Sequence, residues 1–181
     1  MKYIYPEKLY KKIYSENFSI YGIYFKKIME TICEILENIN DKSSILDFGC
    51  GEGYLKKIYY KKDHKHNIIN YDIISEKSEV KDYKNLNYDL IVASHVFCLF
   101  SEKNLCDFLQ NEINKNKDIK FIVAIGKQSL VSKIAQFITN KRSSNSYNQL
   151  SGAEELEIIS RYKKLVYKKN ILFMTDVCYF I

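Results

Sequence analysis

Short apolar runs alternate with longer amphipathic segments over most of the chain. Four of these runs are rich in isoleucine and valine and are too short to be buried helices. We therefore interpret each run as a strand of a parallel sheet that is covered on both faces. The four runs are SSILDFG (43–49), IINYDII (68–74), YDLIVASHVF (88–97) and IKFIVAIG (119–126).

The amphipathic segments between the runs predict helices. Residues 7–40 are expected to form two helical pieces, because apolar residues recur at helical spacing from 28 to 39. Further helices are expected over 53–62, 101–116, 129–141 and 152–162, the last with a capping box made by Ser151 and Glu154. This alternation of strands and helices is typical of the α/β class with a doubly wound, mostly parallel sheet.

The C-terminal part of the chain has a different pattern. Residues 141–152 are polar without apolar periodicity and predict a loop. Two strand-like runs within 164–181 predict a hairpin that turns across 168–170. No repeat, low-complexity tract or linker interrupts the pattern, so we expect one domain over residues 1–181.

The formal net charge of +6 raises the question of a nucleic-acid partner. Lysines are spread along the whole chain, whereas nucleic-acid binders usually gather basic residues on one face or in one segment. A nucleic-acid partner is therefore possible but not favoured. No apolar run approaches the ~20 residues of a membrane helix, so no membrane partner is expected.

The cysteine and histidine positions favour a cytoplasmic protein without a metal. The five cysteines (Cys33, Cys50, Cys98, Cys106 and Cys178) are scattered and form no C-x-x-C pair, which fits a reducing compartment. The first residues lack the apolar core and cleavage site of a signal peptide. His64 and His66 stand in a charged stretch without other ligands at suitable spacing, so we interpret them as part of a solvated loop.

Half of the glycines stand on alternate residues of ILDFGCGEG (45–53), between a predicted strand and a predicted helix. Such a turn frees backbone N–H groups at the start of the helix and lets a ligand approach the backbone closely. The spacing is D-x-G-x-G-x-G, formed by Asp47, Gly49, Gly51 and Gly53. Nicotinamide and flavin folds prefer G-x-G-x-x-G, and Tyr54 occupies the place of the third glycine.

This motif resembles the first motif of class I, Rossmann-like S-adenosylmethionine-dependent methyltransferases of the small-molecule type. The resemblance implies a seven-stranded, mostly parallel sheet with a C-terminal antiparallel hairpin. It also implies that residues 1–40 form an N-terminal helical lid and that residues 41–181 form the cofactor-binding core. The implied cofactor is S-adenosyl-L-methionine, with S-adenosyl-L-homocysteine as the product.

The resemblance also assigns cofactor-binding residues. Asp47 is expected to fix the amino group of the cofactor, and the glycine loop, which includes Cys50, is expected beside its methionine part. Asp72, followed by Ile73, ends the next strand, and its two carboxylate oxygens are expected to accept from the two ribose hydroxyls. Asp82 is expected at the adenine amino group, with Tyr83 against the ring. Since the stretch from Asp72 to Asp89 is short, its helix and third strand must be clipped.

The run YDLIVASHVFCLF resembles the fourth strand of the same methyltransferases. The resemblance places Ala93, Ser94 and His95 under the reactive end of the cofactor. His95 is the candidate general base, because histidine titrates near neutral pH; the alternative is that it packs or positions the backbone. Cys98 and Leu99 replace a Glu-His pair that is usual in the family, which leaves the acceptor contacts open.

The N-terminal segment is rich in tyrosine and phenylalanine. Four of its tyrosines are expected either to bond the cofactor carboxylate, to stack on an acceptor ring, or to pack helices onto the sheet. They are Tyr10, Tyr14, Tyr21 and Tyr24.

The function implied is methyl transfer to an O or N atom of a small-molecule acceptor. Amino-directed and cytosine-C5 DNA methyltransferases carry prolines in their catalytic motifs, whereas this chain has a single proline, Pro6. Two alternatives stay open. One is an RNA or protein methyltransferase, and the other is a catalytically inactive, methyltransferase-like subunit that acts through a partner.

Overall fold

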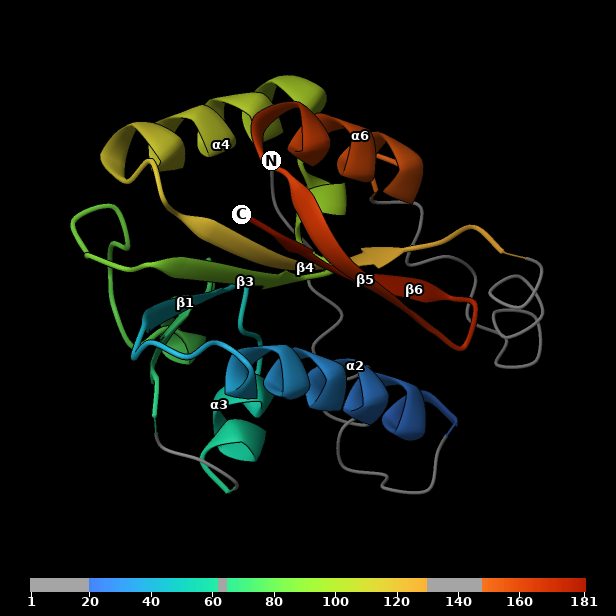
Figure 1. The fold of residues 1–181 in the computed structure, drawn as a ribbon, viewed down its shortest axis with the longest axis horizontal. Helices are drawn as coiled ribbons and strands as arrows, with labels where there is room; N and C mark the ends of the chain where they lie inside the picture. Colours follow the sequence, from blue (N-terminus) through green and yellow to red (C-terminus); the bar gives the residue numbers. More distant parts are fainter. Residues whose placement is uncertain (1–19, 62–64, 130–147) are drawn as a thin grey trace.

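The computed structural model describes residues 20–61, 65–129 and 148–181. Its elements are shown in Figure 1. They are α2 (Ile20–Glu37), β1 (Ser44–Phe48), α3 (Tyr54–Tyr59), β2 (Asn67–Tyr71), η1 (Ser75–Lys77), β3 (Leu90–Ser94), η2 (Phe97–Leu99), α4 (Glu102–Lys115), β4 (Lys120–Gly126), α6 (Gly152–Tyr162), β5 (Leu165–Ile171) and β6 (Thr175–Phe180).

The strands form one sheet in the order β2-β1-β3-β4-β6-β5. The first four strands are parallel, and β6 and β5 join as antiparallel strands. Helices α2 and α3 lie on one face of the sheet, and α4 and α6 lie on the other (Figure 1). The α/β class, the mostly parallel sheet and the antiparallel C-terminal hairpin are as expected, but the described residues form six strands rather than seven.

The missing strand falls between β2 and β3. The described residues 72–89 contain turns and the short helix η1, so β2 becomes an edge of the sheet. Two residues bond the outer edge of β2. The hydroxyl of Tyr60 accepts the Ile68 N–H at 3.1 Å, while Glu79 accepts the Asn70 N–H at 3.2 Å and donates its own N–H to the Asn70 carbonyl at 3.0 Å.

The predicted turn of the C-terminal hairpin is wrong by a few residues. Lys168, Lys169 and Asn170 are paired inside β5, and the chain turns at Leu172 and Phe173. Both turn residues have positive φ, 49° and 59°, a backbone conformation that is usual for asparagine and glycine in tight hairpins. Because the polar KKN triplet looked like a turn and the apolar pair did not, the pattern pointed to the wrong place.

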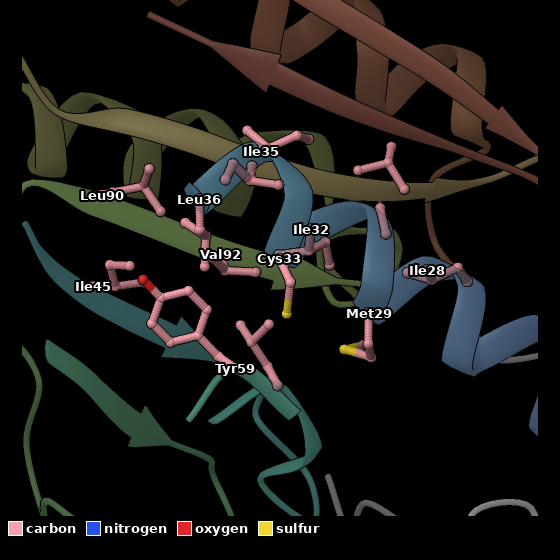
Figure 2. Packing of buried hydrophobic residues seen from close by; sticks show 14 of the residues in the cluster. Ile28, Met29, Ile32, Cys33, Ile35, Leu36, Ile45, Tyr59, Leu90 and Val92 are labelled. Atoms are coloured by element: carbon pink, nitrogen blue, oxygen red, sulfur yellow. The ribbon is translucent and has the colours of Figure 1, made fainter. Parts of the chain in front are cut away.

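The core on the α2 side of the sheet follows from the periodicity of that helix. Ile28, Ile32 and Leu36 recur at four-residue spacing and are fully buried. They belong to one cluster with Tyr59 of α3 and Val92 of β3, and Figure 2 shows Leu36 and Ile32 near Val92. This packing holds α2 against the sheet.

His66 is not in a solvated loop, and that interpretation is wrong. The side chain is 1% exposed and lies between α2 and the start of β1. Its Nδ1 accepts the Ser43 N–H at 3.1 Å, so Nε2 carries the proton and donates to the Leu36 carbonyl at 2.8 Å. The residue therefore joins the end of α2 to the sheet.

Glu155 gives the fold a predicted pH dependence. It lies in the first turn of α6, 1% exposed, and burial raises its pKa from 4.5 to about 8. Between these values the folded protein holds a proton that the unfolded chain has lost, so stability falls as pH rises from about 5 to 8. We expect Glu155→Gln to flatten this fall and to be more stable than wild type at pH 8, by up to a few kcal/mol.

Urea unfolding at pH 5 and pH 8 measures the effect. The matched control is Glu154→Gln in the same helical turn, because glutamine also completes the capping box that Glu154 makes with Ser151. If the free energy of unfolding of Glu155→Gln falls between pH 5 and pH 8 as much as that of wild type, the raised pKa of Glu155 is not the cause of the fall.

No helix in the described part of the chain is long and apolar enough to cross a membrane. The expected first helical piece before residue 20, the helix over 130–141 and most of the polar loop lie outside the described residues.

Candidate functional site

The candidate residues converge at one edge of the sheet, where the parallel strands end. The register pairs Phe48 with Tyr71 and Ser94 with Ala124. The carboxyl edge of such a sheet is where α/β proteins bind ligands. The antiparallel strand β6 starts at the same edge, because Thr175 pairs with Gly126.

The glycine loop between β1 and α3 requires glycine for its backbone conformation. Gly49, Gly51 and Gly53 have φ values of 75°, 55° and 67°, a region that side chains rarely adopt. A Cβ built on Gly49 would lie 2.4 Å from Cγ2 of Val96, so the loop packs closely against the turn after β3. The N–H groups of Gly49 and Cys50 both donate to the Tyr71 carbonyl, at 2.8 and 3.0 Å, which ties the loop to the end of β2.

Asp72 follows β2 directly and binds the glycine loop. Its Oδ2 accepts the Gly51 N–H, and its Oδ1 accepts the Ile74 N–H, each at 2.9 Å. The carboxylate is 6% exposed. Each oxygen of a carboxylate has two lone pairs, so each retains the capacity to accept one further hydrogen bond, such as one from a ribose hydroxyl.

Asp47 is buried near the end of β1, with 5% of its surface exposed. Burial, followed by the negative charges of Asp72 and Glu79, raises the pKa of Asp47 to about 7. Three carboxylates in one neighbourhood favour binding of a cation, which would lower that pKa again. The site therefore suits a ligand with a positive group near Asp47.

Cys50 occupies the loop without reactive character. Its Sγ lies 3.5 Å from the Lys77 carbonyl, to which it donates. Burial and the nearby Asp47 raise the pKa of the thiol, so it stays protonated. We conclude that Cys50 connects the loop to η1 through this hydrogen bond.

Asp82 and Tyr83 lie beside the end of β2, although the strand expected between β2 and β3 is absent from the described residues 72–89. The Tyr83 ring centroid lies 4.7 Å from that of Tyr71 and 5.2 Å from that of Phe48. Asp82 caps its own turn, since its Oδ1 accepts the Lys84 N–H at 2.9 Å. Ile73, next to Asp72, is 78% exposed and presents an apolar surface at the same edge.

The end of β3 places Ala93, Ser94 and His95 in sequence along the edge. Ala93 is fully buried, Ser94 is half-buried, and His95 turns out of the strand with a φ of 56°. The His95 N–H donates to the Ala124 carbonyl at 3.0 Å. Burial lowers the pKa of His95 to about 4, so the imidazole is neutral at pH 7.

Thr175, the first residue of β6, was missed by the sequence analysis. Its Oγ1 lies 3.4 Å from Nε2 of His95, and the Tyr24 hydroxyl bonds to the same Oγ1. Only the antiparallel return of β6 brings this residue to the end of β4, and no local motif marks it. Tyr24 is the described one of the four candidate tyrosines; Tyr10 and Tyr14 lie outside the described residues, as does the side chain of Tyr21.

A cavity of about 290 Å³ lies on the other side of the glycine loop. Gly53, Lys56 and Asn70 are among its lining residues, and two ion pairs, Lys56–Glu79 and Lys77–Glu52, lie in its wall. None of Asp72, Ser94 and His95 lines it. Within the described ranges, no three His, Cys, Asp or Glu side chains are grouped as metal ligands.

Solved structures with a similar fold include several methyltransferases. Magnesium protoporphyrin IX methyltransferase (ChlM) from Synechocystis PCC 6803 is 8% identical, with a TM-score of 0.58, and the match covers 96% of this chain and 92% of that chain. The 1,6-didemethyltoxoflavin-N1-methyltransferase from Burkholderia thailandensis is 10% identical, with a TM-score of 0.58 and coverages of 99% and 92%. The small RNA methyltransferase HEN1 is 14% identical, with a TM-score of 0.63 and coverages of 86% and 25%.

Identities this low show a common fold and leave the acceptor undetermined. None of the curated proteins matches the chain in sequence. The profile of the methyltransferase domain family, in contrast, matches residues 22–118, which is more than half of the chain. This match spans the glycine loop, Asp72 and the end of β3, and with the fold it shows that the chain belongs to the class I S-adenosylmethionine-dependent methyltransferases.

Proposed function

We propose that S-adenosylmethionine binds at the carboxyl edge of β1, β2 and β3 and that the chain transfers its methyl group to an O or N atom of a small molecule. The observation that carries this proposal is the glycine loop. Its three glycines have positive φ, and the Gly51 N–H donates to the Asp72 carboxylate. The loop presents bare backbone beside a carboxylate, as an adenosyl ligand with two ribose hydroxyls requires.

The candidate cofactor-binding residues contact different parts of the cofactor in this proposal. Asp72 receives the ribose hydroxyls, and Asp47 faces the amino group. The apolar surface of Ile73 and the ring of Tyr83 flank the adenine, with Asp82 near its amino group. Ser94, directly after the buried Ala93, lies at the end of the site at which methyl transfer takes place.

Bound S-adenosylmethionine supplies an electrophilic methyl group on a sulfonium. The protein holds the acceptor atom in line with that methyl group, which is its main contribution to the rate. An acceptor hydroxyl or ammonium must also lose a proton. His95 lies at the end of β3 and is neutral at pH 7, so it has a lone pair. Because a pKa of about 4 makes it a weak base, it takes the proton as the bond to the methyl carbon forms and the acceptor becomes acidic.

Charge and fold together favour a small acceptor. The basic residues are spread along the sequence, and two of the similar structures are named for small molecules, magnesium protoporphyrin IX and 1,6-didemethyltoxoflavin. The net charge of +6 and the likeness to a small RNA methyltransferase make RNA the second candidate.

Calorimetric titration with S-adenosylmethionine and S-adenosylhomocysteine tests the cofactor site. We expect micromolar binding of both by the folded wild-type chain, and its absence would overturn the proposed site. A screen of metabolites for methyl acceptance follows. An RNA acceptor would bind with an affinity that falls steeply as salt is added, whereas a neutral small acceptor would show little change.

A further inference from the structure

Three polar side chains from separate elements meet at the end of β3. They are Tyr24 from α2, Thr175 from β6 and His95 from the turn after β3. The Tyr24 hydroxyl bonds to Oγ1 of Thr175, and the same oxygen lies 3.4 Å from Nε2 of His95. Thr175 therefore joins α2 to the candidate base.

Burial makes the Thr175 hydroxyl dependent on these partners. Thr175 is fully buried and Tyr24 is 7% exposed. A buried hydroxyl without a partner destabilises the fold, so the position favours hydrogen bonds to both neighbours. The pairing of Thr175 with Gly126 in the sheet sets the position of its backbone, from which Oγ1 reaches both partners.

The His95 ring is confined on the side of α2 as well. Its centroid lies 6.4 Å from that of Tyr24 and 6.0 Å from that of Phe25. Its two nitrogens have different surroundings: Nε2 faces Thr175, whereas Nδ1 faces Gly126. A Cβ built on Gly126 would lie 3.5 Å from Nδ1, so the absence of a side chain leaves space next to this nitrogen.

We propose that Thr175, supported by Tyr24, is a positioning residue that holds His95 in the tautomer with its proton on Nε2. In this arrangement Nε2–H donates to Oγ1 of Thr175, and the Thr175 hydroxyl donates to the oxygen of Tyr24. Nδ1 then keeps its lone pair and takes the proton that the acceptor loses as the new bond to the methyl carbon forms. The inference about proton transfer rests on the proposed function, whereas the tautomer does not.

Nitrogen NMR of the imidazole rings reads the tautomer directly in the full chain, without cofactor or acceptor. The chain has only three histidines, and His95→Gln assigns the His95 signals by their disappearance. We expect wild-type His95 to show a protonated Nε2 and an unprotonated Nδ1. A wild-type ring protonated on Nδ1 would overturn the proposal.

Thr175→Val and Thr175→Ser form a matched pair, because valine removes the hydroxyl at almost constant volume and serine retains it. We expect mixed tautomers in Thr175→Val, a wild-type spectrum in Thr175→Ser and a partial change in Tyr24→Phe. If Thr175→Val is unfolded, Tyr24→Phe decides. A wild-type tautomer in both Tyr24→Phe and a folded Thr175→Val would overturn the proposal.

Measurements of kcat and of S-adenosylmethionine affinity distinguish a failure of this inference from a failure of the proposed function. With the acceptor found by the screen, we expect kcat to fall roughly 10-fold in Thr175→Val and to recover in Thr175→Ser, at unchanged affinity for S-adenosylmethionine. A tautomer that responds to Thr175 in a chain that fails to bind S-adenosylmethionine would overturn the proposed function and keep the positioning role. Full kcat in a Thr175→Val protein with altered tautomer would overturn the role in proton transfer.

Discussion

Asp72→Ala is expected to weaken S-adenosylmethionine binding by at least about 100-fold. Two hydrogen bonds from ribose hydroxyls to a carboxylate contribute roughly 1.5–3 kcal/mol each, and each 1.4 kcal/mol is a factor of ten in affinity. The substitution also removes the acceptor of the Gly51 N–H and the Ile74 N–H. The loss therefore acts on the ligand directly and on the shape of the glycine loop.

Calorimetry on three variants separates these two effects. Asp72→Asn keeps an oxygen acceptor and the side-chain volume, so we expect it to bind better than Asp72→Ala and worse than wild type. Asp107→Ala removes a carboxylate from the exposed part of α4 and serves as the charge control, with wild-type affinity expected. Wild-type affinity in a folded Asp72→Ala protein would rule out the ribose role.

Gly49→Ala is expected to destabilise the fold by about 2–5 kcal/mol and to abolish cofactor binding. Its backbone φ of 75° costs a side chain roughly 1–2 kcal/mol, and overpacking adds about 1–3 kcal/mol. The overlap is severe, because the new Cβ would lie 2.4 Å from Cγ2 of Val96. The melting temperature should fall by roughly 5–15 °C.

Two further substitutions test the cause of this loss. Gly126→Ala is the stability control, because its Cβ would meet only ordinary contacts, the nearest at 3.5 Å. Val96→Ala combined with Gly49→Ala relieves the overlap while the strained φ remains, so we expect partial recovery of stability. A Gly49→Ala protein as stable as Gly126→Ala would contradict the packing of the loop against Val96.

The regular parts of the fold could be predicted from the sequence because each depends on residues that are close together in the chain. Runs of isoleucine and valine predicted the strands that became β1, β2, β3 and β4. The serine and glutamate of a capping box predicted the start of α6, where both reciprocal bonds form between Ser151 and Glu154. The glycine loop was recognisable because glycines on alternate residues, directly after a strand, are typical of a backbone that a ligand approaches closely.

The remaining features depend on contacts between distant residues. The burial of His66 needs the end of α2 above it, and the place of Thr175 needs the whole C-terminal hairpin. The turn at Leu172 and Phe173 goes against local preference, since both residues adopt positive φ. The lowered pKa of His95 likewise follows from burial, which periodicity alone does not give for a single residue.

The edge of β2 bears on how the protein behaves in a crowded solution. An uncovered strand edge is a template on which another chain can add a strand, and such additions lead to aggregation. Here the hydroxyl of Tyr60 already accepts the outward N–H of Ile68, and the carboxylate and backbone N–H of Glu79 bond the outward N–H and carbonyl of Asn70. The β2 edge that the missing strand leaves open is thus less available for pairing with another chain, through two residues that lie outside the strand itself.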